Sequence, residues 1–403
     1  MNSQKTKLRD QLKSMRTEMA AMCDAIFMHP ETGGEEWYAQ ALLTDYLKAH
    51  GFTVEMGVGG MPTSFRAVWE CGSGGPTVGF LCEYDALRAL GHGCGHHMQG
   101  PAAVAAAATL KMNSDGVPMR IVVYGTPDEE YGNGKVTMLQ NGCFRDMDFA
   151  LMSHAGPNTT VDIKSLAMRS AYVRFHGCAA HAAIKPEDGR SAVDAMLLAI
   201  HGFELLREHV RNDVRLHYAI RKTGESVNVV PDFAEAEFAA RSYSAEYLEH
   251  VWKRIEKIFC GAADMMETTV DQIPVSDCKN KIPVLRLNRL LMEHATELGA
   301  PQMIPYREQT GSTDFGNILH IMPGSCIRTA FVPEGTSSHS KKYIDEGKSE
   351  ALHDAALLAA QVLALSAWDI FHDEELRKEI KTEFLHNLAA EKKEAECSVV
   401  VKQ

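Results

Sequence analysis

Short apolar runs typical of β-strands alternate with segments of helical spacing between residue 3 and about residue 155, and this limits the possible folds more than any other feature. The β-type runs are FTVEMGV, SFRAVWE, TVGFLCEYD, RIVVYGTP and FALMSH. Apolar residues recur at helical spacing over 3–28, 35–50, 98–112 and 134–143. Strands that alternate with helices in this way predict an α/β sheet with helices on both of its faces.

The pattern changes from about residue 168. The strand AYVRFHG is followed by a helix from Ser191, strands near 213–222 and 234–242, a helix over 244–262 and the strand ETTVDQ. The order βαββαβ predicts a ferredoxin-like domain over 168–275, inserted into a larger α/β domain formed by 1–167 and 276–403. After the insertion we expect helices over 286–298 and 347–368, then a charge-rich helical tail from Asp373 whose final residues are frayed.

Length and composition exclude several classes of protein. The 403 residues favour two or three domains, and a net charge of −12 without a basic, aromatic-rich run excludes nucleic acid as an expected partner. No run of about 18 apolar residues predicts a membrane span. The charged N-terminus MNSQKTKLRDQLKSMRTEM lacks the apolar segment of a secretory signal. The ten cysteines are scattered singly, as reduced thiols are, so we expect a cytoplasmic protein.

The stretch GHGCGHH, Gly91 to His97, places three histidines and a cysteine within seven residues. Its alternate glycines are compatible with a plain turn. A cysteine beside a histidine is also compatible with a thiol nucleophile at Cys94. The third alternative is metal ligation, because Cys94 and His96 lie two apart and project to one side of an extended segment. Thiolate with imidazole suits zinc and its first-row neighbours, and the density of histidine favours this alternative.

Further candidate ligands follow other strands, at the sheet edge where ligands gather in α/β folds. Glu129 and Glu130 come after RIVVYG, and His154 ends FALMSH. Paired glutamates are also common at solvated helix starts, and a lone histidine is an ordinary polar residue. Adjacent glutamates point differently, however, so one can bind metal while the other moves protons. The set predicts a site for one or two divalent ions (Zn, Mn or Co), with Glu129 as general base and with these ligands: Cys94, His96, Glu130, His154 and His339.

Several segments, taken in order, are similar to the blocks of a known family: EYDALRALGHGCGHH, TPDEEYGNGK, ALMSHAG, GCAAHAAIKPEDGRSAVDA, NVVPD and GSTDFGN with SSHS. They resemble the metal-dependent aminoacylase and carboxypeptidase amidohydrolases of peptidase clan MH. Within that family the resemblance is nearest to the p-aminobenzoyl-glutamate hydrolases and to dipeptidases that cleave β-alanyl dipeptides. It covers about residues 75–370, and so many blocks in one order make it specific.

The resemblance implies a two-metal, aminopeptidase-like catalytic domain and an inserted lid domain that also forms a homodimer. It assigns the five ligands and the base to the same residues as the reasoning above. It also places His181, in GCAAHAA, on a histidine that polarises the scissile carbonyl and often reaches the active site of the second copy in the dimer. Four further residues fall on substrate-facing positions, the first two at the substrate's carboxylate: Asn228, Arg241, Gly311 and Ser312.

The predicted reaction is metal-dependent hydrolysis of the amide bond of an N-acyl or N-aryl-acyl amino acid, or of a dipeptide with a free carboxylate. Two other functions stay open: a cysteine-nucleophile hydrolase using Cys94, and a non-catalytic small-molecule-binding protein of the same fold. Asp85 is expected either near the metals or in a turn. Departures from the family pattern at His97, Asp128 and Cys178 bear on metal preference and substrate identity rather than on the class of reaction.

Overall fold

The computed structural model describes residues 3–307 and 310–398, and the chain forms two compact units. The larger unit consists of Met1–Lys164, Lys281–Thr310 and Asp314–Ala389. The inserted unit consists of Ser165–Asn280, Gly311–Thr313 and Ala390–Gln403. The roles predicted for these two parts, metal binding for the first and lid and dimerisation for the second, stay predictions.

The larger unit is built on an eight-stranded mixed sheet in the order β1-β2-β4-β3-β5-β12-β6-β11. The neighbours β4, β3, β5 and β12 are parallel, and β1 and β2 add antiparallel strands at one edge. The strands are β1 (Thr53–Met56), β2 (Phe65–Cys71), β3 (Thr77–Cys82), β4 (Met119–Gly125), β5 (Phe149–Gly156), β6 (Thr159–Val161), β11 (Met303–Tyr306) and β12 (Gly324–Ala330). The sequence did not predict β6 and β11, because such short runs carry no readable alternation.

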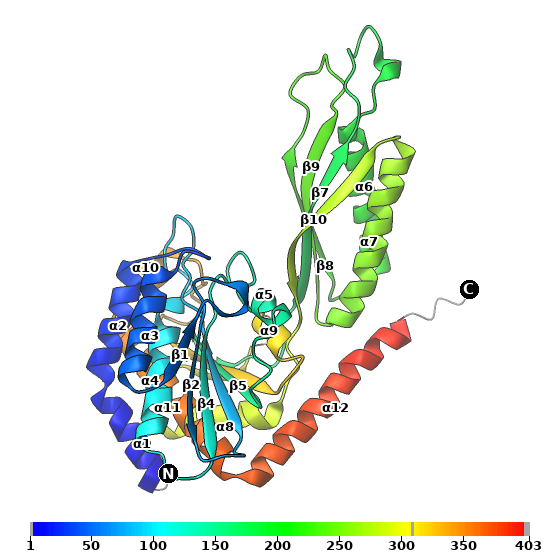
Figure 1. Ribbon diagram of the computed structural model, residues 1–403. Helices are drawn as coiled ribbons and strands as arrows, with labels where there is room; N and C mark the ends of the chain where they lie inside the picture. The colour runs from blue at the N-terminus through cyan, green and yellow to red at the C-terminus, as the bar shows by residue number, and fades with distance from the viewer. Residues whose placement is uncertain (1–2, 308–309, 399–403) are drawn as a thin grey trace. The chain divides into compact units, whose positions relative to one another are not determined.

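Alternate residues of the central strands face two separate helical layers, which Figure 1 shows on either side of the sheet. Phe80, Ile121 and Leu151 pack in the core that contains α1 to α4, α8, α11 and α12. Leu81, Val122 and Met152 pack in a second core with α5 and α9. The helices are α1 (Ser3–Ser14), α2 (Arg16–Met28), α3 (Trp37–Ala49), α4 (Gln99–Met112), α5 (Gly134–Gln140), α8 (Leu285–Glu297), α9 (Phe315–Ile318), α10 (Lys341–Asp345), α11 (Glu350–His372) and α12 (Glu374–Ser398).

Two helical predictions need correction. The segment 3–28 is not one helix: the Met15 amide is shared between the carbonyls of Gln11 and Leu12, and this tightened turn separates α1 from α2. At the other end, α11 runs on to His372 and the tail forms α12; residues 399–403 of the tail predicted to fray lie outside the described residues. Within the described chain, α11 is the helix long and apolar enough to cross a membrane, and 83% of its most apolar window is buried inside the protein.

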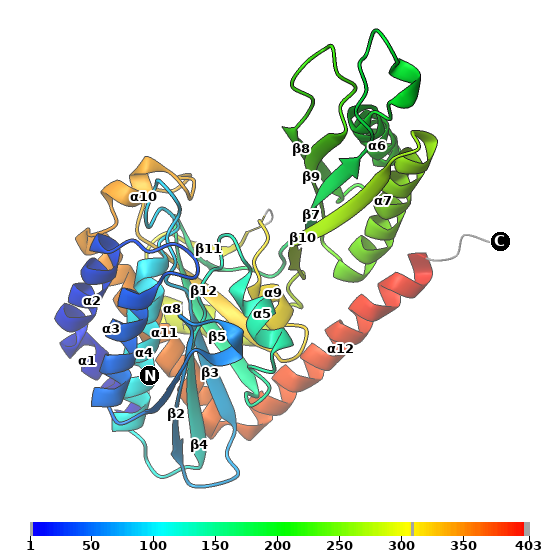
Figure 2. The same cartoon turned by 45° about the horizontal axis from the view of Figure 1, so that its top comes forward.

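The inserted unit has the predicted βαββαβ order: β7 (Ala167–His176), α6 (Ala192–Leu206), β8 (Arg215–Lys222), β9 (Phe233–Ser242), α7 (Ala245–Met265) and β10 (Thr269–Cys278). Its antiparallel sheet runs β10-β7-β9-β8, with α6 and α7 packed on one face (Figure 2). Both helices begin at a serine N-cap, because the hydroxyls of Ser191 and Ser244 accept backbone N–H bonds from Asp194 and Tyr247. The predicted fold class, an α/β domain with an inserted ferredoxin-like domain, is confirmed.

Candidate metal centre and active site

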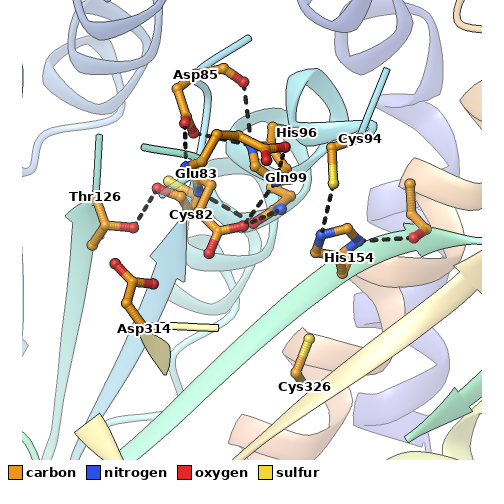
Figure 3. Close-up of polar contacts among 12 residues, drawn as sticks. Cys82, Glu83, Asp85, Cys94, His96, Gln99, Thr126, His154, Asp314 and Cys326 are labelled. Carbon is orange, nitrogen blue, oxygen red and sulfur yellow. Dashed lines mark hydrogen bonds and ion pairs between the residues drawn. The ribbon is translucent and has the colours of Figure 1, made fainter. Parts of the chain in front are cut away.

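The carboxyl ends of β4, β3 and β5 lie side by side in the sheet, and the predicted ligands follow them. Glu83 and Asp85 come directly after β3, the Glu129–Glu130 pair follows β4 in a turn, and His154 lies near the end of β5. Parallel strands bring these ends to one edge, so residues far apart in the sequence meet there. Figure 3 shows Glu83, Asp85, Cys94, His96 and His154 gathered at this edge.

The GHGCGHH stretch is a turn, but a turn built to present side chains. Gly95 has a left-handed φ of 82°, and a Cβ there would lie 2.4 Å from the Cβ of Ala155, so only glycine fits. The close approach places Cys94 and His96 against β5. The Cys94 Sγ lies 3.8 Å from His154 Nε2, and the imidazoles of His96 and His154 meet edge to face at 5.4 Å.

All five predicted ligands belong to groups that can hold an ion. One group joins Cys94, His96 and His154, and a second joins Cys94, Glu130 and His339; the ligand atoms within each group lie within 4.8 Å of one another. The two groups share Cys94. A third group of the same kind joins Glu83, His96 and Glu129, and it contains a residue, Glu83, that the sequence did not single out.

Hydrogen bonds behind the ligands fix their orientation. The Asp85 carboxylate accepts from His96 Nδ1 at 3.0 Å through one oxygen and from the Glu130 backbone N–H at 2.9 Å through the other. His96 Nε2 therefore points into the cluster, 3.3 Å from Glu83 Oε2 and 3.9 Å from Glu130 Oε1. His154 Nδ1 donates to the Ala155 carbonyl at 2.8 Å, which turns its Nε2 toward Cys94. Metal-ligating histidines are held in this way, with the second ring nitrogen bonded to a carboxylate or carbonyl.

Two buried polar atoms in the cluster, His96 Nε2 and Glu130 Oε1, have no hydrogen-bond partner. A buried polar atom without a partner costs about 1–3 kcal/mol, so the arrangement is favourable only when something else satisfies these lone pairs. Both atoms point toward the same group of sulfur, nitrogen and oxygen donors, a set that suits Zn²⁺ and other first-row divalent ions. The residues present therefore fit a divalent metal site.

The acidic residues around the cluster have strongly perturbed proton affinities. Burial, and then the carboxylates of Glu83 and Asp314, raise the pKa of the Glu129 carboxyl well above its ordinary value. Burial also disfavours the charged form of Glu83, but the Lys135 ammonium and His96 outweigh it and lower the pKa of Glu83 to about 2. The cluster therefore places an ionised carboxylate beside one that binds a proton readily, as acid–base sites do.

Four residues close to the predicted site were missed from the sequence. Glu83, Gln99, Lys135 and Asp314 are all buried, and Lys135 donates to both Glu83 and Asp314. Glu83 carried a usable signal, since it directly follows an apolar strand just as the Glu129–Glu130 pair does. Lys135 and Asp314 carried none, because a local pattern does not reveal that a charged residue will be buried beside partners far along the chain.

The substrate-facing residues predicted in the inserted unit form two separate sets. His181 and Asn228 lie on exposed loops that pair with each other, since His181 bridges to Val229 and the Ala182 N–H donates to the Asn228 carbonyl. At the other end of β9, Arg241 Nη1 donates to Ser312 Oγ at 2.9 Å, and the Gly311 carbonyl accepts from Leu166 just before β7. The structure thus brings Arg241, Gly311 and Ser312 together, apart from His181 and Asn228.

The three departures from the family pattern have different surroundings. His97 is buried, its Nε2 bonds the Gly347 carbonyl at 2.8 Å, and its ring packs against Phe27. Asp128 has a left-handed φ of 58° and lies so close to two glycines, Gly33 and Gly132, that a Cβ on either would collide with it. Cys178 is an exposed thiol.

An α/β unit with a thiol, imidazole and carboxylate cluster at its strand ends, carrying an inserted ferredoxin-like unit, defines a class of metal-site hydrolases. Comparison of the sequence with known families agrees with this class. The chain belongs to Peptidase family M20/M25/M40, whose pattern matches residues 83–364.

Individual relatives span nearly the whole chain. The Xaa-Arg dipeptidase of Mus musculus is 31% identical over 404 residues, covering 96% of this chain and 93% of the mouse protein. A polypeptide of the p-aminobenzoyl-glutamate hydrolase of Escherichia coli K12 is 31% identical over 454 residues, covering 93% of each chain. The predicted family, its named relatives and the prediction of an amidohydrolase are confirmed.

Solved structures support the fold. An aminobenzoyl-glutamate utilization protein from Klebsiella pneumoniae superposes with a TM-score of 0.72 at 21% identity, over 89% of this chain and 98% of its own. A dinuclear metal-binding M20 peptidase from Bacillus subtilis superposes with a TM-score of 0.67 at 17% identity, over 89% of this chain and 99% of its own. At these identities the similarity is one of architecture.

Proposed function

We propose that the protein hydrolyses the amide bond of a dipeptide or an N-acyl amino acid with a free carboxylate, using divalent metal ions held by Cys94, His96, Glu130, His154 and His339. One observation carries the proposal: side chains from four separate parts of the chain converge, with two buried lone pairs unsatisfied, beside Glu129. Thiolate together with imidazole and carboxylate favours Zn, Mn or Co as the ions.

Glu129 is the proposed general base. The chemistry that bound divalent ions supply at such a site is activation of water at neutral pH and polarisation of a carbonyl oxygen. Burial and the neighbouring carboxylates give Glu129 a high affinity for protons, so it can take a proton from the attacking water and pass it to the leaving amine. Because Glu129 belongs to neither of the two groups that contain the predicted ligands, its carboxylate stays free for this step.

The substrate class follows from the relatives and from the residues of the inserted unit. The names Xaa-Arg dipeptidase and p-aminobenzoyl-glutamate hydrolase both denote an amino acid joined through an amide. Arg241 is half-buried next to Ser312, and a planar guanidinium can bind a carboxylate through two parallel bonds. We assign Arg241, Gly311 and Ser312 to the substrate's carboxylate, together with Asn228, and His181 to the scissile carbonyl.

A homodimer through the inserted unit is part of the proposal. Arg241 and the His181 loop lie at opposite ends of β9, whose ten residues span roughly 30 Å, longer than a dipeptide. One inserted unit therefore cannot place both on one small substrate, whereas a second copy can supply the missing set. The edge strand β8 and helix α6 expose apolar side chains that a second copy would cover: Tyr218, Ile220, Leu197, Leu198 and Leu205.

A cysteine hydrolase is the second candidate, because Cys94 Sγ lies 3.8 Å from an imidazole nitrogen of His154. The two candidates respond in opposite ways to simple reagents. A metal-dependent enzyme loses activity with a chelator and regains it with Zn²⁺, Mn²⁺ or Co²⁺. A cysteine enzyme survives the chelator and is inactivated by iodoacetamide.

A cytoplasmic location completes the proposal. Nine cysteines of the described chain are free thiols, and four of them are buried in the larger unit. Unpaired cysteines in such number fit a reducing compartment.

The deciding experiment compares wild-type protein with Glu129→Gln after reconstitution with each metal, on dipeptides ending in Arg, β-alanyl dipeptides, N-acyl amino acids and p-aminobenzoyl-glutamate. We expect wild type to release free amine from one of these groups. The variant should lose roughly 10²–10⁴-fold in kcat, the usual contribution of a general base, and keep its metal. Glu55→Gln, an exposed carboxylate on β1, is the matched control. Undiminished hydrolysis by Glu129→Gln would overturn the assignment of the base.

A further inference from the structure

The three ligand groups of the larger unit cannot all hold an ion at once. His96 belongs to two of them, one with Cys94 and His154 and the other with Glu83 and Glu129. Its Nδ1 is committed to Asp85, so only Nε2 is available. An ion bound by Glu83, His96 and Glu129 would take His96 from the first group and would also ligate the carboxylate proposed as the base.

Lys135 lies against the competing group. This lysine comes from α5, is completely buried, and donates from Nζ to Glu83 Oε1 at 2.5 Å and to Asp314 Oδ1 at 2.7 Å. The other oxygen of Glu83 accepts from Gln99 Nε2 at 2.8 Å. Both oxygens of Glu83 therefore already have a donor, and one donor is a full positive charge.

We propose that Lys135 is a positioning residue that excludes a divalent cation from the Glu83–His96–Glu129 group and so keeps Glu129 free to act as base. The inference rests on the proposed function. His96 Nε2 is buried and unpartnered and lies 3.3 Å from Glu83, so this group offers an ion a real binding position. The ammonium opposes that binding in two ways: it occupies a Glu83 oxygen, and it repels a second positive charge in a buried, weakly screened place.

Removing Lys135 reverses the preference. Glu83 and Asp314 would be left as two buried carboxylates without their counter-ion, and buried charges require a partner. The protein can supply that partner either as a proton or as a metal ion. The unpartnered His96 Nε2 and the nearby Glu129 favour the metal ion, because together with Glu83 they form a complete set of three ligands.

The test is the metal content of Lys135→Met. We expect equilibrium dialysis against buffered Mn²⁺, followed by elemental analysis, to find one more ion per protein chain than in wild type. Electron paramagnetic resonance of Mn²⁺ should show an added signal. Hydrolysis by Lys135→Met should fall roughly 10²–10⁴-fold as the extra ion binds, the loss expected when a general base is taken away, and should recover as free metal is lowered. Adding Glu83→Gln to the variant should remove the extra ion.

Control variants separate this inference from loss of structure. Lys5→Met also breaks a part-buried lysine pair, with Asp369, and should keep wild-type metal content and activity. If Lys135→Met does not fold, Lys135→Met with Asp314→Asn removes one charge of each sign and carries the same test. An unchanged metal content in the folded variant, with a proton taken up instead, overturns the inference while the proposed function stands. Wild-type protein that binds no metal overturns both.

Discussion

The two units of this protein present their functional residues in contrasting ways. In the larger unit the ligands are held at strand ends by buried hydrogen bonds, as Asp85 holds His96 and Glu130. In the inserted unit His181 and Asn228 lie on exposed loops, and Arg241 lies at the far end of β9. The larger unit thus has a preorganised metal centre, whereas each inserted unit offers two half-sites that one substrate cannot bridge.

Mixed dimers test this contrast with the largest expected effect. Glu129→Gln and His181→Ala should each be nearly inactive alone, since a base and an oxyanion donor are each worth at least about 10²-fold. If His181 serves the active site of the other copy, a dimer that contains one chain of each kind has one intact site. Random mixing should then restore about a quarter of wild-type activity, measured as amine release after refolding the variants together.

If His181 acts within its own chain, neither site of the mixed dimer is complete. A mixture that stays as inactive as its components would therefore contradict the dimer proposal without touching the metal centre. Each variant must also keep the metal content of wild type.

A smaller effect is expected from Asp85→Ala. Its carboxylate orients two proposed ligands, so its loss should weaken metal binding by roughly 10–100-fold, as is usual for residues that hold metal ligands in place. Asn228→Ala is the matched change in the inserted unit and should raise KM without altering metal affinity. Calorimetric titration with Zn²⁺ measures the metal affinity of both variants. Equal metal affinities in the two variants would erase the distinction between the units.

The smallest effect concerns stability against acid. Burial raises the pKa of Asp369, but hydrogen bonds from His294 and Lys5 outweigh it, so the folded pKa lies below its ordinary value. Its contribution is then complete above the unfolded pKa of about 4 and is lost as pH falls through the folded pKa. Asp369→Asn should cost about 1–2 kcal/mol of unfolding free energy at pH 7 and little near pH 3.

The inserted unit supplies the control for that prediction. Its Arg190–Glu267 pair is exposed, so Glu267→Gln should change the unfolding free energy by less than about 0.5 kcal/mol at either pH. Urea unfolding at the two pH values measures both variants. A pH-independent loss in Asp369→Asn would mean that the carboxylate stabilises the fold by packing rather than by charge.

The sequence allowed most of the fold and the ligand set to be predicted, because both leave local marks. Alternating runs mark strands, and Cys94, His96 and Glu130 stand where such strands end. The Lys135 contacts left no such mark: its partners Glu83 and Asp314 lie 52 and 179 residues away. The contact of Arg241 with Ser312, 71 residues apart, was hidden for the same reason. Burial of a charge is a property of the assembled chain, so local patterns do not encode it.

The central claim is that Cys94 is shared by two ion positions that leave Glu129 unligated. A crystal structure of the metal-loaded protein, with anomalous scattering recorded at the metal edge, tests this most directly. We expect one peak among Cys94, His96 and His154 and another among Cys94, Glu130 and His339. A peak bound by Glu129, or the lack of any peak at Cys94 in active protein, would contradict the claim.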